Sequence, residues 1–472
     1  MNHHSYFGPV GRRVEACLVG SGAFGRSLLA TRVPHLSVRV AVDVDTATAA
    51  GAFRAAGWSA DSIVEAEGPE AAALAFAQGK AVAARQIEDV LDLPVEIVVE
   101  ATGHPEAGAR HADLAIAAGR HVALVSKEAD SVVGPYLAAI AARKGLVVTP
   151  VDGDQPSLLI DLVTWAEVLG MDIVAAGKSS EYDFVFDPQT QTLSSNGATI
   201  AAPGFGALME LGGGHASGIV AARSAAAAGL PQRAVPDLCE MGVVAHSVDL
   251  TPDTPGCHVP LARTSEVPSL FTTTEDGGLL SGNRRIDVFH CLRLPGELSF
   301  AGGVFVVVRV RDGESWDVLA AKGHIMGRNG NTAMIALPRH LLGLEAATSI
   351  LEATLLNRSS GAASPRPRLD LVATATRDLP AGTLLSALGH HHTIDGVEAA
   401  LVPASALAPQ AAAPYYLVAN RRLKRTVASG QAIRVADVDI DGASDLNRLR
   451  QAQDELFFGD RVRASAGAAG QG

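Results

Sequence analysis

Short runs of branched apolar residues alternate with longer alanine-rich stretches over the first 150 residues of the chain. The runs have the length and composition of strands, and the stretches between them show the apolar spacing of helices. We expect strands at residues 14–19, 38–42, 95–100, 121–125 and 146–150, and helices in the stretches that start at Arg26, Thr46, Glu70, His111 and Tyr136. Strands separated by helices predict an α/β fold with a parallel sheet covered by helices on both faces.

The pattern changes in the next two hundred residues. Apolar spacing predicts helices at residues 157–168 and 341–356, and β-branched runs predict strands at 173–176 and 305–311. Between Asp187 and Gly214 the chain is polar and rich in glycine, which predicts a long loop that acts as a lid or a substrate loop.

A domain boundary is expected at residues 359–367, which are small, polar and interrupted by proline. The short apolar runs that follow are punctuated by glycine and proline, and they predict a small β-rich module up to Ile440. A last helix is expected from Ser444, as its N-cap, to Leu456, with a disordered tail from Arg461. The expected domains are residues 10–155, 156–360 and 368–440, followed by a helix and tail in 441–472.

Composition and charge narrow the class of protein. A chain of 472 residues corresponds to about three domains. The net charge of −12 and the aromatic content of 4% disfavour a surface for nucleic acid or for anionic membranes. No apolar run reaches the length of a membrane span, and the first residues lack the basic and apolar regions of a signal peptide. A soluble cytoplasmic protein is expected.

The cysteines show no metal-binding or disulfide spacing. Cys17, Cys239, Cys257 and Cys291 form no CxxC pair, which favours reduced thiols over a zinc site or a disulfide framework. The three adjacent histidines at residues 390–392 are expected to form a polar loop rather than a metal site, because neighbours in an extended segment point to opposite faces.

The segment Gly-Ser-Gly-Ala-Phe-Gly at residues 20–25 is a GxGxxG motif between an expected strand and an expected helix. In that context Gly20 allows the tight turn, Gly22 lets the backbone approach a pyrophosphate, and Gly25 lets the helix pack against the strand. Free N–H groups at the helix start, beside Ala23 and Phe24, would hold the anion. The motif therefore predicts a dinucleotide-binding domain, with a simple turn between strand and helix as the alternative.

An acidic residue follows at the expected distance. Asp43 ends the second expected strand, where a carboxylate accepts hydrogen bonds from the adenosine ribose and repels a 2′-phosphate. Asp45 is a second candidate for this role. The sequence therefore favours NAD over NADP. Thr102 and Gly103 end another expected strand at the same edge of the sheet and are expected to line the nicotinamide ribose.

Polar residues that follow expected strands are the candidates for the chemistry. Lys127 would lie at the carboxyl edge of the parallel sheet, where an ammonium polarises a carbonyl or shuttles a proton; an exposed surface lysine is the alternative. Asp152 and Asp154 would bind a divalent ion or a substrate hydroxyl, or cap the next helix. Lys178, in the polar segment 177–181, suits a polyol or a phosphate, or belongs to an ordinary turn.

Further segments accompany the glycine motif: residues 100–110 (Glu-Ala-Thr-Gly-His-Pro-Glu-Ala-Gly-Ala-Arg), 128–130, 134–137, 153–157 (Gly-Asp-Gln-Pro-Ser), 176–178 and 338–341 with Glu345. Together they resemble the homoserine-dehydrogenase-like oxidoreductases that carry a C-terminal SAF domain, among them the deoxyxylulose-phosphate reductoisomerase-like enzymes. The resemblance covers residues 10–456.

The resemblance implies an N-terminal Rossmann domain, an α+β catalytic and oligomerisation domain, and a small β-rich SAF (β-clip) domain that contains residues 374–382 and 427–431. It also implies a homo-oligomer. The reductoisomerase-like enzymes make methylerythritol phosphate with NADPH and a divalent metal, Mg²⁺ or Mn²⁺.

The chain departs from the reductoisomerase-like pattern where cofactor and substrate would lie. Residues 42–45 (Val-Asp-Val-Asp) replace a basic strand end that suits NADPH, and Gln155 replaces an acidic residue. Lys127 has no counterpart in that pattern and is similar instead to the catalytic Asn-Lys turn of homoserine dehydrogenases.

We therefore predict an NAD(P)-dependent oxidoreductase that acts on a small polar carbonyl or alcohol, free or phosphorylated. Lys127 or Lys178 is expected to handle the alcohol proton, and Asp154 to orient the substrate or a metal. NAD is the expected cofactor, with Mg²⁺ or Mn²⁺ as a candidate metal. The alternatives are the reductoisomerase reaction, a catalytically silent nucleotide sensor or scaffold, and plain homoserine dehydrogenase.

Overall fold

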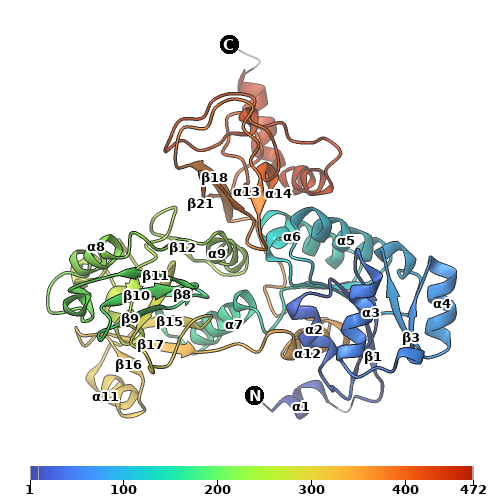
Figure 1. The fold of residues 1–472 in the computed structure, drawn as a ribbon, viewed down its shortest axis with the longest axis horizontal. Helices are drawn as coiled ribbons and strands as arrows, with labels where there is room; N and C mark the ends of the chain where they lie inside the picture. Colours follow the sequence, from blue (N-terminus) through green and yellow to red (C-terminus); the bar gives the residue numbers. More distant parts are fainter. Residues whose placement is uncertain (1, 9, 470–472) are drawn as a thin grey trace.

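The computed structural model describes the backbone of residues 2–8 and 10–469 and the side chains up to residue 459. It contains a seven-stranded parallel sheet, a ten-stranded mixed sheet and two short antiparallel strand pairs (Figure 1). Residues 10–150, which carry the first sheet, are called the first lobe, residues 151–358 the second lobe, and residues 368–469 the C-terminal segment. Within the described residues, no helix combines the length and the apolar composition that crossing a lipid bilayer requires.

The first lobe is a Rossmann-like parallel sheet, as the alternation of strands and helices predicts. The strand order is β3-β4-β2-β1-β5-β6-β7, with β1 (Val14–Val19), β2 (Leu36–Val42), β3 (Ile63–Glu65), β4 (Ala81–Ala84), β5 (Ile97–Glu100), β6 (His121–Leu124) and β7 (Val148–Thr149). Helices cover both faces: α2 (Ala23–Leu29), α3 (Thr46–Ala55), α4 (Pro69–Ala77), α5 (Pro105–Ala117) and α6 (Lys127–Ala142). The order reverses between β1 and β5, and such a switch point is where ligands bind in open parallel sheets.

The second lobe is built on the mixed sheet, in the order β11-β10-β9-β14-β8-β15-β17-β16. Its strands are β8 (Asp172–Ser179), β9 (Phe184–Asp187), β10 (Thr192–Ser195), β11 (Ala198–Ala201), β14 (Arg285–Arg293), β15 (Val304–Arg309), β16 (Ile325–Met326) and β17 (Thr332–Leu337), with β12 (Thr251–Pro252) and β13 (Leu261–Ala262) beside β14. Its main helices are α7 (Gln155–Val168), α8 (Ala216–Ala226), α9 (Val235–Ser247) and α11 (Gly313–Ala321).

The glycine-rich segment from Asp187 to Gly214 contains a hairpin, so the expectation of an unstructured loop there is wrong. β10 and β11 pair around Asn196 and Gly197, whose φ angles are +46° and +76°. Asn-Gly is the dipeptide that two-residue hairpin turns prefer, because both positions need positive φ.

Two further predictions, for residues 341–356 and for the C-terminal tail, also need correction. The stretch expected as one helix from Leu341 to Leu356 is a 3-10 turn (Leu342–Leu344), the short α12 (Ala347–Leu351) and a π turn (Glu352–Leu356). The break occurs where Leu342 takes a φ of +53° and the Gly343 N–H donates to Ser27 of the first lobe. The tail expected to be disordered belongs to α14 (Asp445–Ala469) as far as it is described, in keeping with its many alanines; residues 470–472 lie outside the described part.

The C-terminal segment combines β18 (Leu369–Ala375), β19 (Ala387–Leu388), β20 (Thr393–Ile394) and β21 (Val397–Pro403) with the short helix α13 (Tyr415–Val418). α14 then runs along α5 and α6 of the first lobe (Figure 1). At its start Ser444 and the Asp445 N–H donate to Glu106, and further along Gln453 donates to the carbonyl of Val132 at 2.9 Å. The segment is thereby anchored on the first lobe.

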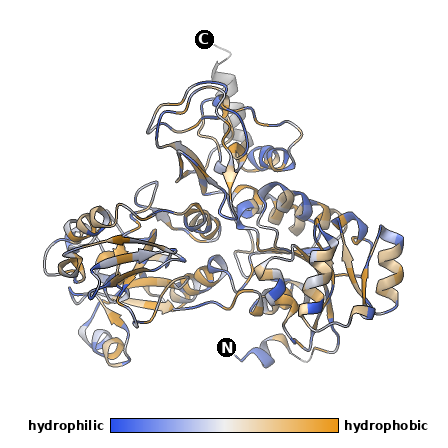
Figure 2. Cartoon of the chain, in the orientation of Figure 1, coloured by the Kyte–Doolittle hydropathy of each residue, from blue (hydrophilic) through white to orange (hydrophobic). Residues whose placement is uncertain are grey.

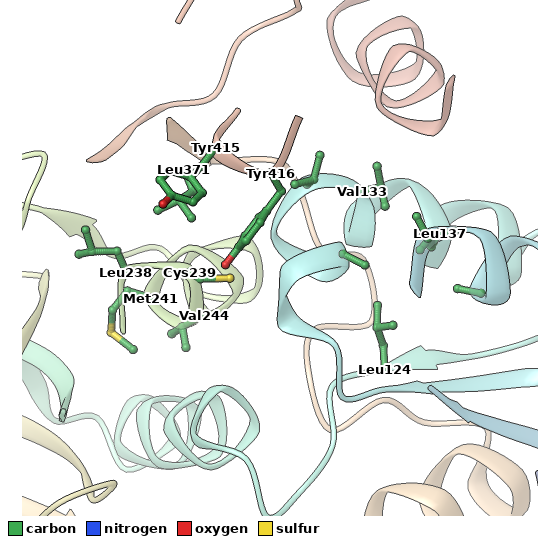
Figure 3. Close-up of a cluster of buried hydrophobic side chains, with 14 of the residues drawn as sticks. Leu124, Val133, Leu137, Leu238, Cys239, Met241, Val244, Leu371, Tyr415 and Tyr416 are labelled. Atoms are coloured by element: carbon green, nitrogen blue, oxygen red, sulfur yellow. The ribbon is translucent and has the colours of Figure 1, made fainter. Parts of the chain in front are cut away.

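One apolar cluster continues through all three parts of the chain. It includes Val133 and Leu137 on α6, Leu238 and Met241 on α9, and Leu371 on β18, all of them buried (Figure 3). Apolar residues concentrate along the strands, while hydrophilic residues lie mainly on the outer faces of the helices (Figure 2). Because burial of apolar surface is the dominant favourable term in packing, this shared core fixes how the three parts sit together.

Candidate active site

The glycine loop, residues 20–25, lies between β1 and α2 at the switch point of the first sheet. Gly20 has a φ of +96°, and a Cβ there would lie 2.6 Å from the carbonyl oxygen of Ala101. A Cβ on Gly25 would collide with the carbonyl of Gly20. At Gly22, by contrast, a Cβ would meet no described atom within 4 Å. Two of the three glycines are thus required by the protein's own backbone, whereas Gly22 leaves open space in front of the loop.

Asp43 supports this loop from the end of β2. Its Oδ2 accepts a hydrogen bond from the Ser21 N–H at 2.9 Å, and the buried Ser21 hydroxyl has no partner among the described residues. Asp45 instead caps α3 by accepting from the Ala47 N–H at 3.1 Å. Open space at Gly22, an unpartnered hydroxyl and a carboxylate at the strand end are together what a bound dinucleotide requires, so the residues fit this group.

Two more predicted cofactor residues lie beside the loop, because β5 neighbours β1. The Thr102 hydroxyl donates to Glu100 at 2.7 Å, and the Gly103 N–H donates to the Ser126 hydroxyl at 2.8 Å. The remaining predicted pair, Ala23 and Phe24, forms the first turn of α2. The structure thus brings all the predicted cofactor residues to one edge of the sheet.

Lys127 and Lys178 meet on one carboxylate that sequence reasoning missed. Both ammonium groups bind Glu240, one through each carboxylate oxygen, and Lys178 Nζ also lies 2.9 Å from Asp237 Oδ1. Lys127 begins α6, Lys178 lies on β8, and the two acids lie one turn apart on α9. These four residues are called the lysine–carboxylate cluster below. Lys178 is fully buried, whereas the Lys127 side chain remains 22% exposed.

The acids keep both lysines charged. Burial alone lowers the pKa of Lys178, but Asp237 and Glu240 outweigh burial and raise it above its ordinary value. The pKa of Lys127 is likewise raised, because Glu240, followed by Asp154, outweighs burial. Both lysines therefore hold their proton at neutral pH and can act as proton donors or stabilise a developing negative charge, rather than act as bases.

Asp154, the third predicted catalytic residue, caps α7 and accepts from the Gln155 N–H at 3.0 Å. Helix capping is one of the roles that the sequence left open for Asp154. The charge of Asp154 nevertheless acts on Lys127. Asp152 accepts from Ser157 within the same turn and from Thr348. Both aspartates therefore have structural contacts of their own.

A second polar group follows β8, next to Lys178. Gln155 donates to Glu181, and the Nε2 atom of His340 lies 3.7 Å from the same carboxylate. The nearby His340 lowers the pKa of Glu181 to about 2, and Glu181 in turn raises the pKa of His340. Both shifts favour the charged form of the side chain concerned, so together they favour an ion pair between Glu181 and His340.

The sequence around Asp237 and Glu240 contains a pattern from which their pairing with positive groups could have been predicted. They lie three residues apart in the otherwise apolar α9, so they share a face of a buried helix. Two carboxylates on such a face require positive partners, because unpaired buried charges are rare. His340 falls within a segment that carries the family resemblance, but nothing local indicates its partner.

Asp237 and Glu240, the two acids of the lysine–carboxylate cluster, are both paired with lysines. Within the described part of the chain, no group of three or more His, Cys, Asp or Glu side chains is arranged to hold a metal ion. His258, which follows Cys257, bonds to Asp287 at 2.6 Å instead. The donor set does not fit a resident Mg²⁺ or Mn²⁺, and we assign no step to a metal.

Comparison with known proteins adds one match by sequence. Residues 236–346 match the sequence model of a family described as the catalytic domain of oxidoreductase DRL. The match is to the catalytic part of an oxidoreductase. It includes Asp237, Glu240 and His340. No protein in the curated collection matches the chain.

The solved structures that match the chain are distant from it in sequence. A 3-ketoreductase from Actinomadura kijaniata in complex with TDP-benzene and NADP is 15% identical over 38% of this chain and 48% of its own, with a TM-score of 0.24. A DOX-P reductoisomerase in complex with magnesium is 14% identical over 36% and 46%, with a TM-score of 0.26. An oxidoreductase from Bacillus cereus is 13% identical over 74% and 92%, with a TM-score of 0.32. The chain spans about half the length of the first two.

Proposed function

We propose that this protein is an NAD(P)-dependent oxidoreductase that acts on a small polar carbonyl or alcohol. One juxtaposition carries the proposal: the glycine loop follows β1, and the protonated Lys127 follows β6, at the same edge of one parallel sheet. The match of residues 236–346 to an oxidoreductase catalytic domain supports it. Asp43, at the end of β2, favours NAD over NADP.

The lysines have different roles in the proposed mechanism. A bound nicotinamide supplies or accepts the hydride at the edge of the sheet. Lys127, the exposed member of the cluster, donates its hydrogen bond and then its proton to the carbonyl oxygen as negative charge develops there. Lys178 is fully buried and neutralises and orients Glu240, so it acts as a positioning residue.

The neighbouring polar groups indicate the class of substrate. Gln155, Glu181 and His340 offer donors and acceptors for hydroxyl groups next to Lys178. The raised pKa of His340 favours its protonated form, which suits a substrate with an anionic substituent, such as a phosphate. We propose a hydroxylated small molecule, free or phosphorylated, with Asp154 helping to orient it.

We further propose that residues 156–360 form the catalytic domain and that the chain acts as a homo-oligomer. The C-terminal segment is proposed to be the SAF-like module that the sequence resembles. Its antiparallel β18–β21 pair and its many short bridges are compatible with a small β-rich unit.

The experiment is a turnover assay with a matched pair of proteins. Wild type and the double variant Lys127→Met/Lys178→Met are offered NADH or NADPH with deoxyxylulose phosphate and with a panel of hydroxyketones and sugar phosphates, with and without Mn²⁺. We expect oxidation of the nucleotide by wild type and none by the double variant, at similar nucleotide affinity. Equal turnover by both proteins contradicts the assignment, and Mn²⁺-dependent turnover of deoxyxylulose phosphate favours the reductoisomerase reaction instead.

A further inference from the structure

The C-terminal segment sends a hairpin tip between the two lobes. β19 and β20 pair with each other, and residues 389–392 join them. The tip bonds to each lobe through a different histidine. His392 Nε2 donates to the carbonyl of Gly103 at 2.7 Å, and His391 Nε2 lies 3.0 Å from the Tyr182 hydroxyl. Gly103 belongs to the proposed cofactor edge, and Tyr182 adjoins Glu181 of the polar group beside Lys178.

The core of the C-terminal segment holds this tip in place. Tyr415 is fully buried; its hydroxyl donates to the carbonyl of His392 at 3.1 Å and accepts from the Ile394 N–H at 3.2 Å. The ring of His392 also packs edge-on against the rings of Tyr416 and His104. Both tyrosines belong to the apolar cluster shared by the three parts of the chain, and Figure 3 shows them above α9. The tip is therefore anchored to the core through Tyr415 and Tyr416.

His391 bonds to Tyr182, the neighbour of Glu181, and so lies within reach of the charges of the proposed site. The charges that act on its imidazole come from Lys127, Asp237 and Glu181, as well as from the adjacent His390. Burial, followed by the neighbouring His390 and Lys127, lowers the pKa of His391, so the ring is neutral at pH 7. A neutral imidazole has one donor and one acceptor nitrogen, which suits a hydroxyl or carbonyl oxygen. His390, by contrast, is exposed.

We infer that the tip at residues 389–392 is a wall of the active site, contributed by the C-terminal segment. His391 contacts a hydroxyl or carbonyl oxygen of the substrate and helps to set specificity. His392 is a positioning residue that holds the Gly103 loop against the nicotinamide end of the cofactor. The inference rests on the proposed function, since it assumes that the cofactor edge binds a nicotinamide nucleotide.

The first arm of the test measures cofactor affinity, which needs no known substrate. NADH and NADPH are titrated into wild type, His392→Ala, His392→Gln and the control Leu388→Ala, with nicotinamide fluorescence as the readout. Loss of one hydrogen bond that orders the loop is expected to raise Kd about tenfold for His392→Ala. His392→Gln, which keeps a donor, is expected to recover most of the affinity, and Leu388→Ala to match wild type.

The second arm measures the substrate that the turnover panel identifies. His391→Ala is expected to raise KM about tenfold or more, with kcat and cofactor Kd close to those of wild type. Tyr182→Phe, which removes the hydroxyl that orients His391, is expected to raise KM less. Leu388→Ala serves as the control, because it removes an exposed side chain of β19 that lies in the same hairpin but outside the tip.

The outcomes separate the two proposals. A wild type that binds neither nucleotide overturns the proposed function and this inference with it. A wild type that binds the nucleotide while His392→Ala binds it equally well overturns only the wall assignment. An unchanged KM in His391→Ala, in an enzyme that turns over, overturns the substrate contact. If no substrate is found, the affinity arm decides alone.

Discussion

The glycine loop and the lysine–carboxylate cluster lie near the same edge of the first sheet, but they obtain their geometry in different ways. The loop belongs to one strand–turn–helix unit, and its supports come from the next strand ends, at Asp43 and Ala101. The cluster takes one residue from α6, one from β8 and two from α9. It therefore exists only once both lobes have packed. A local unit can lose ligand binding without losing its fold, whereas a cluster assembled from buried charges couples activity to stability.

Removal of Glu240 tests that coupling most severely. Glu240→Ala leaves the fully buried Lys178 and the partly exposed Lys127 short of a counter-charge, and breaking such a site is expected to cost about 3–5 kcal/mol of unfolding free energy. Urea unfolding measures the loss. The control is Glu297→Ala, which breaks a partly exposed pair with Arg263 and is expected to cost no more than about 1 kcal/mol. Equal losses in the two variants would show that the cluster does not support the fold.

The single lysine variants separate chemistry from support within the cluster. Lys127→Met is expected to lower kcat by about 10²–10⁴-fold, because it removes the proton donor, with little loss of stability. Lys178→Met is expected to lower both kcat and stability, because Lys178 is fully buried against Glu240 and Asp237. Steady-state kinetics and urea unfolding of both variants provide the comparison. A Lys127→Met enzyme with wild-type kcat would remove this residue from the chemistry.

In the glycine loop, substitutions at two different glycines separate a loss of stability from a loss of nucleotide binding. Gly25→Ala places a methyl group against the Gly20 carbonyl and is expected to cost about 1–3 kcal/mol of stability. Gly22→Ala meets no described atom of the protein, so we expect a wild-type fold with nucleotide affinity lowered about tenfold or more. Thermal unfolding and nucleotide titration distinguish the two. Unchanged affinity in Gly22→Ala would argue that no pyrophosphate approaches the loop there.

Glu128 shows that charge compensation around the cluster is incomplete. Burial raises the pKa of Glu128 to about 7, despite the neighbouring Lys127. Between about pH 4.5 and pH 7 the folded state then holds more protons than the unfolded state, so stability falls as the pH rises through this window. Glu128→Gln removes this decline and is expected to gain about 2–3 kcal/mol on wild type between pH 5 and pH 8. Urea unfolding at both pH values checks the sign; parallel curves would contradict it.

The smallest expected effect concerns the choice of cofactor. Asp43→Asn keeps a side-chain acceptor for the Ser21 N–H but removes the charge that would repel a 2′-phosphate. We expect the ratio of NADPH to NADH affinity to rise about tenfold, with the fold unchanged. Asp45→Asn is the matched control, because Asn is also a good helix cap at the start of α3. A wild type that prefers NADPH would refute the role given to Asp43.

Elements with strong local signals were predicted closely. The run at residues 14–19 coincides with β1, and the expected helix at 157–168 lies within α7. The Asn-Gly hairpin was missed, although its signal was present, because the polar composition of the surrounding segment suggested a loop. The helix expected from Leu341 is broken by contacts with the first lobe, and no local pattern predicts such contacts.

The sequence by itself determined the parallel sheet, the glycine loop and the place of Asp43 at a strand end. These features depend on apolar periodicity and on residues close along the chain, which act the same way wherever the unit packs. Only the tertiary structure decided that both lysines share Glu240 and that His392 reaches Gly103. Lys127 and Glu240 lie 113 residues apart in the sequence, and His392 and Gly103 lie 289 apart. Hydrophobic periodicity determines which face of a helix or strand is buried. Which other element that face packs against depends on the core that the three parts share.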